Sequence, residues 1–155
     1  MEMFNRPFFA AISAPSLPIG SPGEARLALD DFAPQDVANI AWSEATLAFA
    51  DAPWLEAIAS ASIRRMAAYR TQEIAAMAWS CASLEFLDGP LMSALSEASM
   101  AKISTFQPPE VSGMAWSLAM LAVCDRPLLH AMSGQAMARI SSFGPRALAN
   151  TAWAV

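Results

Sequence analysis

The chain has 155 residues, which suits a single domain, and it is 55% hydrophobic but only 15% charged. This composition excludes a disordered chain, and alanine, at about a fifth of the residues, favours helix over strand. The net charge of −5 argues against a strongly basic nucleic-acid binder. No apolar run approaches the roughly 20 residues that a membrane span needs, so we expect no membrane partner.

The first segment, residues 1–31, is predicted to hold a degenerate helix followed by a loop. Arg6–Ser13 parallels Arg126–Ser133 in the order of its apolar and small residues. A stretch rich in proline, glycine and serine follows at about 14–23, which is typical of a loop.

From residue 32 onward the sequence repeats with a period of 37 residues. The columns with the clearest register are tryptophan, at 42, 79, 116 and 153, and an aromatic residue, at 32, 69, 106 and 143. The period predicts a helical repeat domain over 32–155, with complete units at 32–68, 69–105 and 106–142 and a partial unit at 143–155.

Each unit predicts two helices. In the first unit, a helix at about 34–50 is apolar over most of its girth, which indicates burial between neighbours. A second helix at about 52–68 starts at an Asp–x–Pro step, where Asp51 is the expected N-cap. Asp88 and Asp125 hold the same position in the next two units.

Two-helix units of this kind bury their apolar faces by stacking, so we expect an all-α fold, a right-handed α-solenoid of 37-residue repeats. The alanine columns allow close helix approach, and the tryptophan column is expected to fill the space between units. Replacing Trp79 by alanine would then cost about 3–5 kcal/mol. Val155 falls inside a predicted helix, which indicates either a piece of a longer protein or an end that pairs with another copy.

Two stretches of the first-helix column carry a family resemblance. FAPQDVANIAWS at 32–43 and FGPRALANTAWA at 143–154 resemble the Pro–x–x–Leu–Ala–Asn–x–x–Trp–Ala signature of the heptatricopeptide and octotricopeptide repeats, the helical repeats associated with RAP domains. The second and third units depart from it, because Ala76 and Gly113 replace the asparagine and Thr71 replaces one proline. The resemblance implies a protein that binds single-stranded or ribosomal RNA in a mitochondrion or chloroplast, in transcript stability, processing, translation or ribosome assembly.

A polar stripe on the first helices is the expected ligand face. Short polar groups at equivalent positions of successive repeats suit the reading of one base per repeat. The alternative is a solvated or closely packed face without a ligand. The candidate residues are Gln35, Asn39, Ser43, Gln72, Ser80, Ser117, Arg146 and Asn150.

A second column holds one cation per unit, at Arg65, Lys102 and Arg139. Cations at a fixed pitch could follow RNA phosphates. Alternatively, a cation in the last turn of a helix stabilises the helix dipole, and its stem covers apolar surface.

Enzyme motifs are weak. The single histidine, His130, occupies a column shared with Glu56 and Ser93, and Ser99 with Lys102 matches Ser–x–x–Lys only by coincidence with two repeat columns. We expect no catalytic residue, metal, cofactor or small-molecule substrate. Two functions stay open: RNA binding, and a protein-interaction scaffold or structural component of an organellar ribonucleoprotein, which fits the acidic charge better.

Overall fold

A computed structural model of the chain describes residue 29 and residues 31–154. The degenerate helix and the loop predicted within 1–31 lie outside the described residues. The described part is all-helical, as predicted, with seven α-helices and no strand. The helices are α3 (Pro34–Leu47), α4 (Ala52–Arg65), α5 (Thr71–Ser83), α6 (Gly89–Lys102), α7 (Pro108–Met120), α8 (Arg126–Ala138) and α9 (Pro145–Ala154). Short 3-10 turns follow α4, α6 and α8, at Met66–Ala68, Ile103–Thr105 and Ile140–Ser142.

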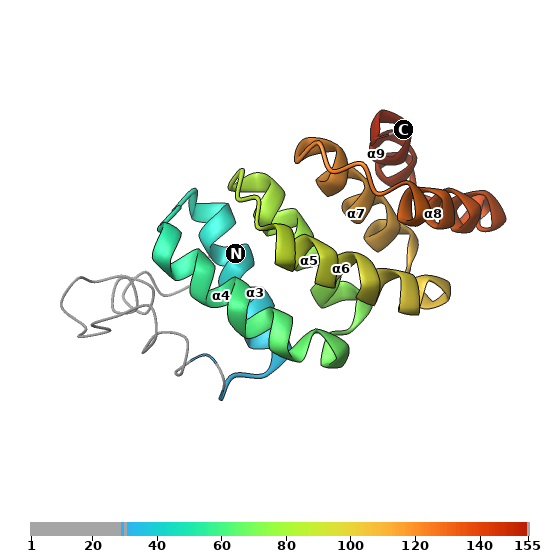
Figure 1. The fold of residues 1–155 in the computed structure, drawn as a ribbon. Helices are drawn as coiled ribbons and strands as arrows, with labels where there is room; N and C mark the ends of the chain where they lie inside the picture. Colours follow the sequence, from blue (N-terminus) through green and yellow to red (C-terminus); the bar gives the residue numbers. More distant parts are fainter. Residues whose placement is uncertain (1–28, 30, 155) are drawn as a thin grey trace, which may run out of the picture.

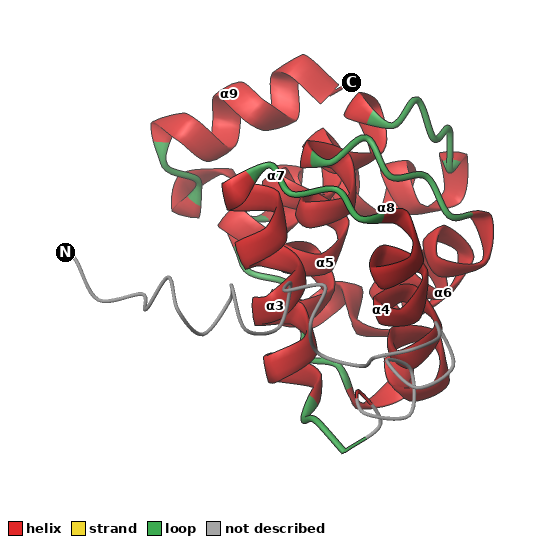
Figure 2. Ribbon diagram, turned by 90° about the vertical axis from the view of Figure 1, so that its left-hand side faces the viewer, coloured by secondary structure: helices red, strands yellow, loops and turns green. Residues whose placement is uncertain are grey.

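The helices form two layers (Figures 1 and 2). We call α3, α5, α7 and α9 the A row, and α4, α6 and α8 the B row. Neighbours within the A row contact one another far more extensively than neighbours within the B row do. Alanine explains this close approach, since Ala41, Ala78 and Ala115 are buried where successive A-row helices meet. A helix without bulky side chains at its contact face lets the neighbouring backbone come near.

The Asp–x–Pro step caps each B-row helix, as predicted. A side-chain oxygen of Asp51 accepts the Trp54 backbone N–H at 2.9 Å, Asp88 accepts that of Leu91 at 2.7 Å, and Asp125 accepts that of Leu128 at 3.0 Å. Each contact satisfies one backbone donor that the first turn would leave without a partner.

A residue with left-handed backbone follows the end of α3, α5 and α7 within two positions. Ala48, Glu85 and Ala122, spaced 37 residues apart, have φ of 51°, 53° and 53°. The next residue donates its N–H to a carbonyl five residues back, as in Phe86 N to Cys81 O at 2.9 Å, which is the Schellman arrangement. The predicted helix 34–50 therefore stops at Leu47, because the chain turns at Ala48.

We expect glycine to stabilise this turn, because a Cβ at positive φ is strained and glycine is not. Ala122→Gly should raise the free energy of unfolding by about 0.5–1 kcal/mol. Ala149→Gly, in the middle of α9, is the matched control and should lower it by about 1 kcal/mol. Equilibrium urea unfolding measures both, and a loss of stability at both positions would contradict the reading of the turn.

The column of aromatic residues that opens the units forms the buried seam between them. Tyr69 and Phe106 are among the largest fully buried side chains, and Phe143 is buried as well. The tryptophan column is different: Trp42 and Trp153 are 47% and 61% exposed. The prediction that the indoles fill the inter-unit space is therefore wrong for these two, whereas Trp79 and Trp116 are half-buried. Tyr69 and Phe106 are buried in the interior of the fold, and Phe32, the first aromatic of their column, is 39% exposed.

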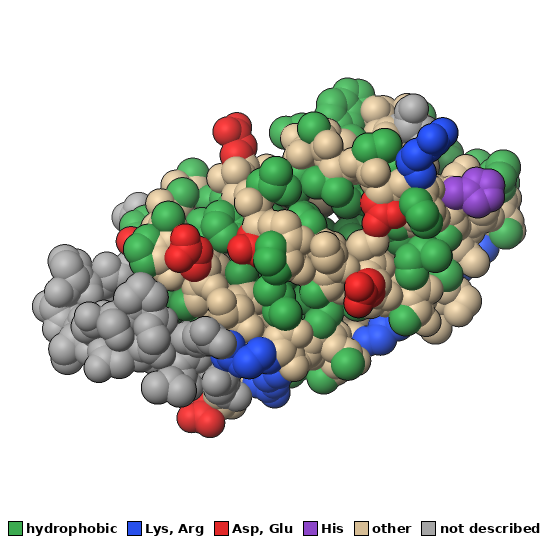
Figure 3. All heavy atoms as spheres, in the orientation of Figure 1, with side chains coloured by type: hydrophobic (Ala, Val, Ile, Leu, Met, Phe, Trp, Pro, Cys, Tyr) green, Lys and Arg blue, Asp and Glu red, His purple; other side chains and the backbone are tan. Residues whose placement is uncertain are grey.

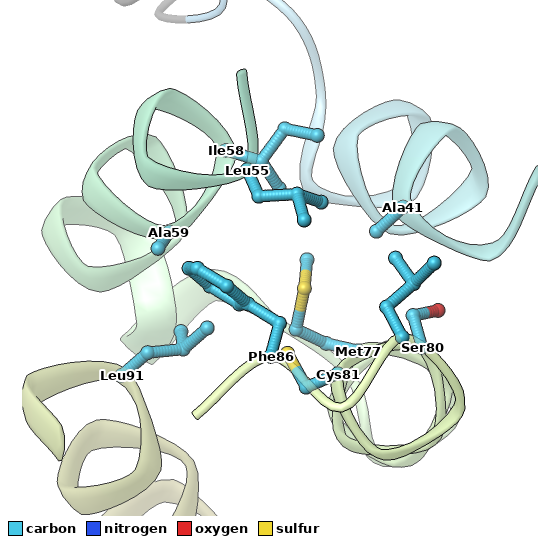
Figure 4. A pocket seen from close by; sticks show the side chains of 10 residues that line it. Ala41, Leu55, Ile58, Ala59, Met77, Ser80, Cys81, Phe86 and Leu91 are labelled. Carbon is cyan, nitrogen blue, oxygen red and sulfur yellow. The ribbon is translucent and has the colours of Figure 1, made fainter. Parts of the chain in front are cut away.

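A small cavity marks the seam between α3, α4, α5 and α6 (Figure 4). Its volume is about 10 Å³, and its walls are almost wholly apolar. The side chains of Met77, Phe86 and Leu91 point toward its centre from three directions. A space of this size holds one water molecule at most, so it is a packing defect and not a ligand site.

Candidate functional site

The outward stripe of the A row combines indoles with amides. In α3, Gln35, Asn39, Trp42 and Thr46 are all exposed, and their spacing of four, three and four residues places them on one side of the helix. The corresponding positions of α5, α7 and α9 are exposed or half-buried. We call this surface the indole face. Its tryptophans are Trp42, Trp79, Trp116 and Trp153.

Neighbouring indoles on this face approach one another. The ring centroids of Trp42 and Trp79 are 6.4 Å apart, and the ring planes are tilted by 33°. Such pairs interact favourably and still leave ring surface open to solvent. The repeat pattern predicts these rings in the core, yet each lies seven residues after a member of the polar stripe, at Gln35, Gln72, Pro109 and Arg146. Seven residues are about two helical turns, so this spacing is the signal that the rings share the stripe.

Two candidate residues are removed from the ligand face by the structure. Ser80 and Ser117 are buried, and each hydroxyl donates to the carbonyl four residues back, to Ala76 O and Gly113 O, at 2.8 Å. Ser43 makes the same contact with Asn39 O at 2.8 Å, although it is only half-buried. This column faces the neighbouring helix of the tightly packed row, so the two buried serines cannot read a base.

The other candidates lie along the indole face. Gln35, Asn39, Gln72 and Arg146 are exposed, and Asn150 is half-buried. The amide oxygen of Gln35 accepts a hydrogen bond from Arg70 Nη2 at 3.0 Å. Arg70 Nε donates a hydrogen bond to Glu73 Oε1 at 2.7 Å. These groups form a polar edge where the A-row helices begin.

The cation column binds backbone. Arg65 donates to Phe32 O and Lys102 to Tyr69 O, and Arg139 donates to Phe106 O at 2.8 Å. Lys102 also reaches Ala67 O at 2.9 Å. All three side chains are half-buried, and each holds the carbonyl of the aromatic residue that opens its own unit. The cation column therefore stabilises the turns that lead into α3, α5 and α7. Because its side chains already donate to backbone carbonyls, they are poorly placed to bind RNA phosphates.

Charged side chains are dispersed over the B-row face of the described residues. Figure 3, seen from the B-row side, shows basic and acidic groups scattered singly among apolar atoms. Within the described residues, no group of three histidine, cysteine or carboxylate side chains could hold a metal ion, and no helix is long and apolar enough to cross a membrane. Ser99 is buried and donates to Leu95 O at 2.7 Å, so it does not pair with Lys102 as a nucleophile would.

Two buried ionisable groups, Glu44 and Cys81, occupy equivalent positions of α3 and α5, about 200° around each helix from its tryptophan. Glu44 is 2% exposed, and burial raises the pKa of its carboxyl group, with Asp51 adding to the rise. The neighbouring Trp54 indole opposes this shift, although its Nε1 completes no hydrogen bond. Burial also raises the pKa of the Cys81 thiol to about 12, and the Asp88 charge acts in the same direction.

The two cysteines should differ in reactivity. Because the thiolate is the nucleophile, buried Cys81 should resist a thiol reagent at neutral pH, whereas exposed Cys124 should react at once. Titration with a chromogenic disulfide should count one thiol in the folded chain and two in denaturant. Two fast thiols in the folded chain would contradict the burial of Cys81, and Cys124→Ser is the control that leaves none.

No protein-family model matches the chain, and the search of curated proteins finds no relative.

Proposed function

We propose that the chain is an RNA-binding helical-repeat protein, a right-handed α-solenoid whose A row binds single-stranded RNA. The observation that carries the proposal is the indole face. Trp42 and Trp153 are exposed, and Trp79 and Trp116 are half-buried, at a pitch of 37 residues. Together with the amides of Gln35, Asn39 and Gln72, these rings suit bases that stack on a ring and donate hydrogen bonds to a neighbouring side chain.

The mechanism differs from base reading by hydrogen bonds alone. With Ser80 and Ser117 buried and the cation column engaged, stacking supplies most of the affinity and the amides supply a modest preference. The repeat resemblance supports a place in organellar RNA metabolism, in a mitochondrion or chloroplast, on transcripts or ribosomal RNA.

The test is an anisotropy titration of a labelled single-stranded RNA with the full chain and with Trp42→Ala. Loss of one stacking platform should weaken binding about 5- to 150-fold, the equivalent of about 1–3 kcal/mol per base. Leu87→Ala, which removes an equally exposed apolar side chain outside the A row, is the control and should bind as the parent does. Equal affinity of Trp42→Ala and the parent would exclude this face.

Salt dependence separates stacking from phosphate tracking. Each phosphate contact on a single strand contributes about −0.7 to the slope of log K against log salt. Exposed Arg146 then gives a slope of about −0.7, which becomes about −1.4 if phosphate also displaces Glu73 from its ion pair with Arg70. Phosphate binding by the whole cation column as well would make the slope steeper than about −2.

A second function is favoured by the charge. The net charge of −5 and the engaged cation column suit a protein-interaction scaffold, and exposed tryptophans are frequent at the centres of protein interfaces. A folded chain that binds no RNA even at low salt would select this alternative.

A further inference from the structure

The three links that lead from an A-row helix to the next B-row helix lie along one edge of the molecule, at the upper left in Figure 1. With the adjoining helix ends they comprise residues 46–53, 83–90 and 120–127, and we call this surface the link edge. Of the eleven exposed large apolar side chains in the described residues, four lie on it: Leu47, Phe49, Leu87 and Met120. Repeated apolar exposure at one edge indicates a surface that packs against a partner.

The exposure at the middle link does not depend on how far the repeat extends. The unit of α5 and α6 contacts α3 and α4 on one side and α7 and α8 on the other. Leu87 is nevertheless 58% exposed, and the equivalent residues, Ala50 and Cys124, are exposed as well. The preceding residue, Phe86, packs against the core. The backbone of each link therefore directs this position outward, even in a unit with a neighbour on both sides.

The link edge is acidic. Its charged residues are four carboxylates against one arginine: Asp51, Glu85, Asp88, Asp125 and Arg126. Asp51 and Glu85 are exposed, and Asp88 is half-buried at the N-terminus of α6. The middle link therefore presents an exposed leucine between two carboxylates and no cation.

The cations lie at the opposite edge, where the B-row helices end and the A-row helices begin. Six of the seven lysines and arginines in the described residues are there: Arg64, Arg65, Arg70, Lys102, Arg139 and Arg146. Charge is thus segregated between the two edges of the repeat. An anionic RNA backbone is repelled by the link edge, whereas a basic segment is attracted to it.

The charge also distinguishes among possible occupants of the link edge. A second copy of the chain carries a net charge of −5. Residues 1–31 hold four carboxylates and two arginines. Neither is basic, so the occupant with complementary charge is a segment of another polypeptide.

We propose that the link edge is a docking site for a basic amphipathic helix of another protein. Leu87 would pack between apolar side chains on one face of that helix, and Glu85 and Asp88 would pair with lysines or arginines beside that face. The proposal does not rest on RNA binding, because Leu87 lies outside the A-row helices.

The experiment uses the full chain and, as the probe, a labelled synthetic helix with leucine on one face and lysine on the other. Anisotropy at low salt should show saturable binding with a Kd of about 1–100 μM. Leu87→Ser should weaken binding about tenfold or more, because it removes the apolar anchor. A peptide with glutamate in place of every lysine should bind at least about tenfold more weakly than the lysine peptide.

A charge variant tests the acidic part of the link edge. Glu85→Gln combined with Asp88→Asn removes two negative charges, and asparagine is as good an N-cap as aspartate. The double variant should bind the lysine peptide about 2- to 30-fold more weakly, in line with two exposed ion pairs. Its affinity should also depend less on salt than that of the parent.

Two controls locate the peptide. Ile140→Ser removes an apolar side chain that is 57% exposed, close to the value for Leu87, but that lies in the turn after α8. Glu97→Gln removes an exposed charge from α6 outside the link edge. Both should leave peptide affinity unchanged.

Three results would overturn the proposal. The first is the absence of saturable binding, and the second is an affinity of Leu87→Ser that equals that of the parent or of Ile140→Ser. The third is a dimer of the chain alone, seen by sedimentation, that Leu87→Ser dissociates, because a second copy would then be the occupant.

Discussion

Replacing Phe106 by alanine should lower the free energy of unfolding by about 3–5 kcal/mol, the largest stability effect we expect from one residue. Its ring is 1% exposed and belongs to the core cluster between α5 and α7, so the substitution leaves a cavity the size of a ring. The contact of Arg139 with the Phe106 carbonyl remains available, because only the side chain changes.

Phe49→Ala is the matched control, since it removes the same ring from an exposed position after α3. We expect it to cost no more than about 1–2 kcal/mol, in proportion to the smaller apolar area it buries. Trp42→Ala should be similarly mild. Equilibrium urea unfolding measures the loss of stability in the three variants. A loss for Trp42→Ala as large as that for Phe106→Ala would contradict the exposed position of this indole.

Replacing Glu44 by leucine should stabilise the chain by about 1–3 kcal/mol at neutral pH, because it removes a carboxylate from a buried site. The equivalent position of α7 is Leu118, which is buried, so the site already accepts that side chain elsewhere in the fold. The gain should vary with pH in a definite direction.

The sign follows from the raised pKa. The folded chain holds the Glu44 proton more tightly than the unfolded chain, whose pKa is near 4.5, so the parent loses stability as pH rises from 4.5 through the raised value and is constant above it. The difference between Glu44→Leu and the parent should therefore grow over that window. Glu97→Leu, which removes a carboxyl group from an exposed position of α6, is the control for the loss of one negative charge. A Glu44→Leu difference that is independent of pH would contradict a titrating buried carboxyl.

The helices were predictable because their signals are local. A proline, an acid or both stand in the first turn of each A-row helix, and the Asp–x–Pro step starts each B-row helix. These signals act within four residues of the chain, so the helix starts and the three aspartate caps follow from sequence. The predicted helix ends were less accurate than the starts. The left-handed turn lies at Ala48, Glu85 and Ala122, and none of these is the glycine that usually marks such a turn in a sequence.

The candidate RNA-binding face was harder to predict than the helices, because it depends on how the units pack against one another. Whether Trp42 or Ser43 faces outward is a difference of one residue, or about 100° around the helix, and only the positions of the neighbouring helices decide it. Arg65, Lys102 and Arg139 each contact a carbonyl 33 residues earlier in the chain. No local sequence pattern therefore shows whether such a cation binds a backbone carbonyl or is available to bind phosphate.

Tryptophan emission during an RNA titration tests the role of the indole face most directly. A base that stacks on an indole quenches it, so the emission of the full chain should fall as single-stranded RNA is added, with the same midpoint as anisotropy. A variant that keeps only Trp54, with leucine at 42, 79, 116 and 153, should bind weakly and show no quenching, because leucine offers no ring for stacking. RNA binding that leaves the parent emission unchanged, or no RNA binding by the folded chain, would contradict recognition by the exposed indoles.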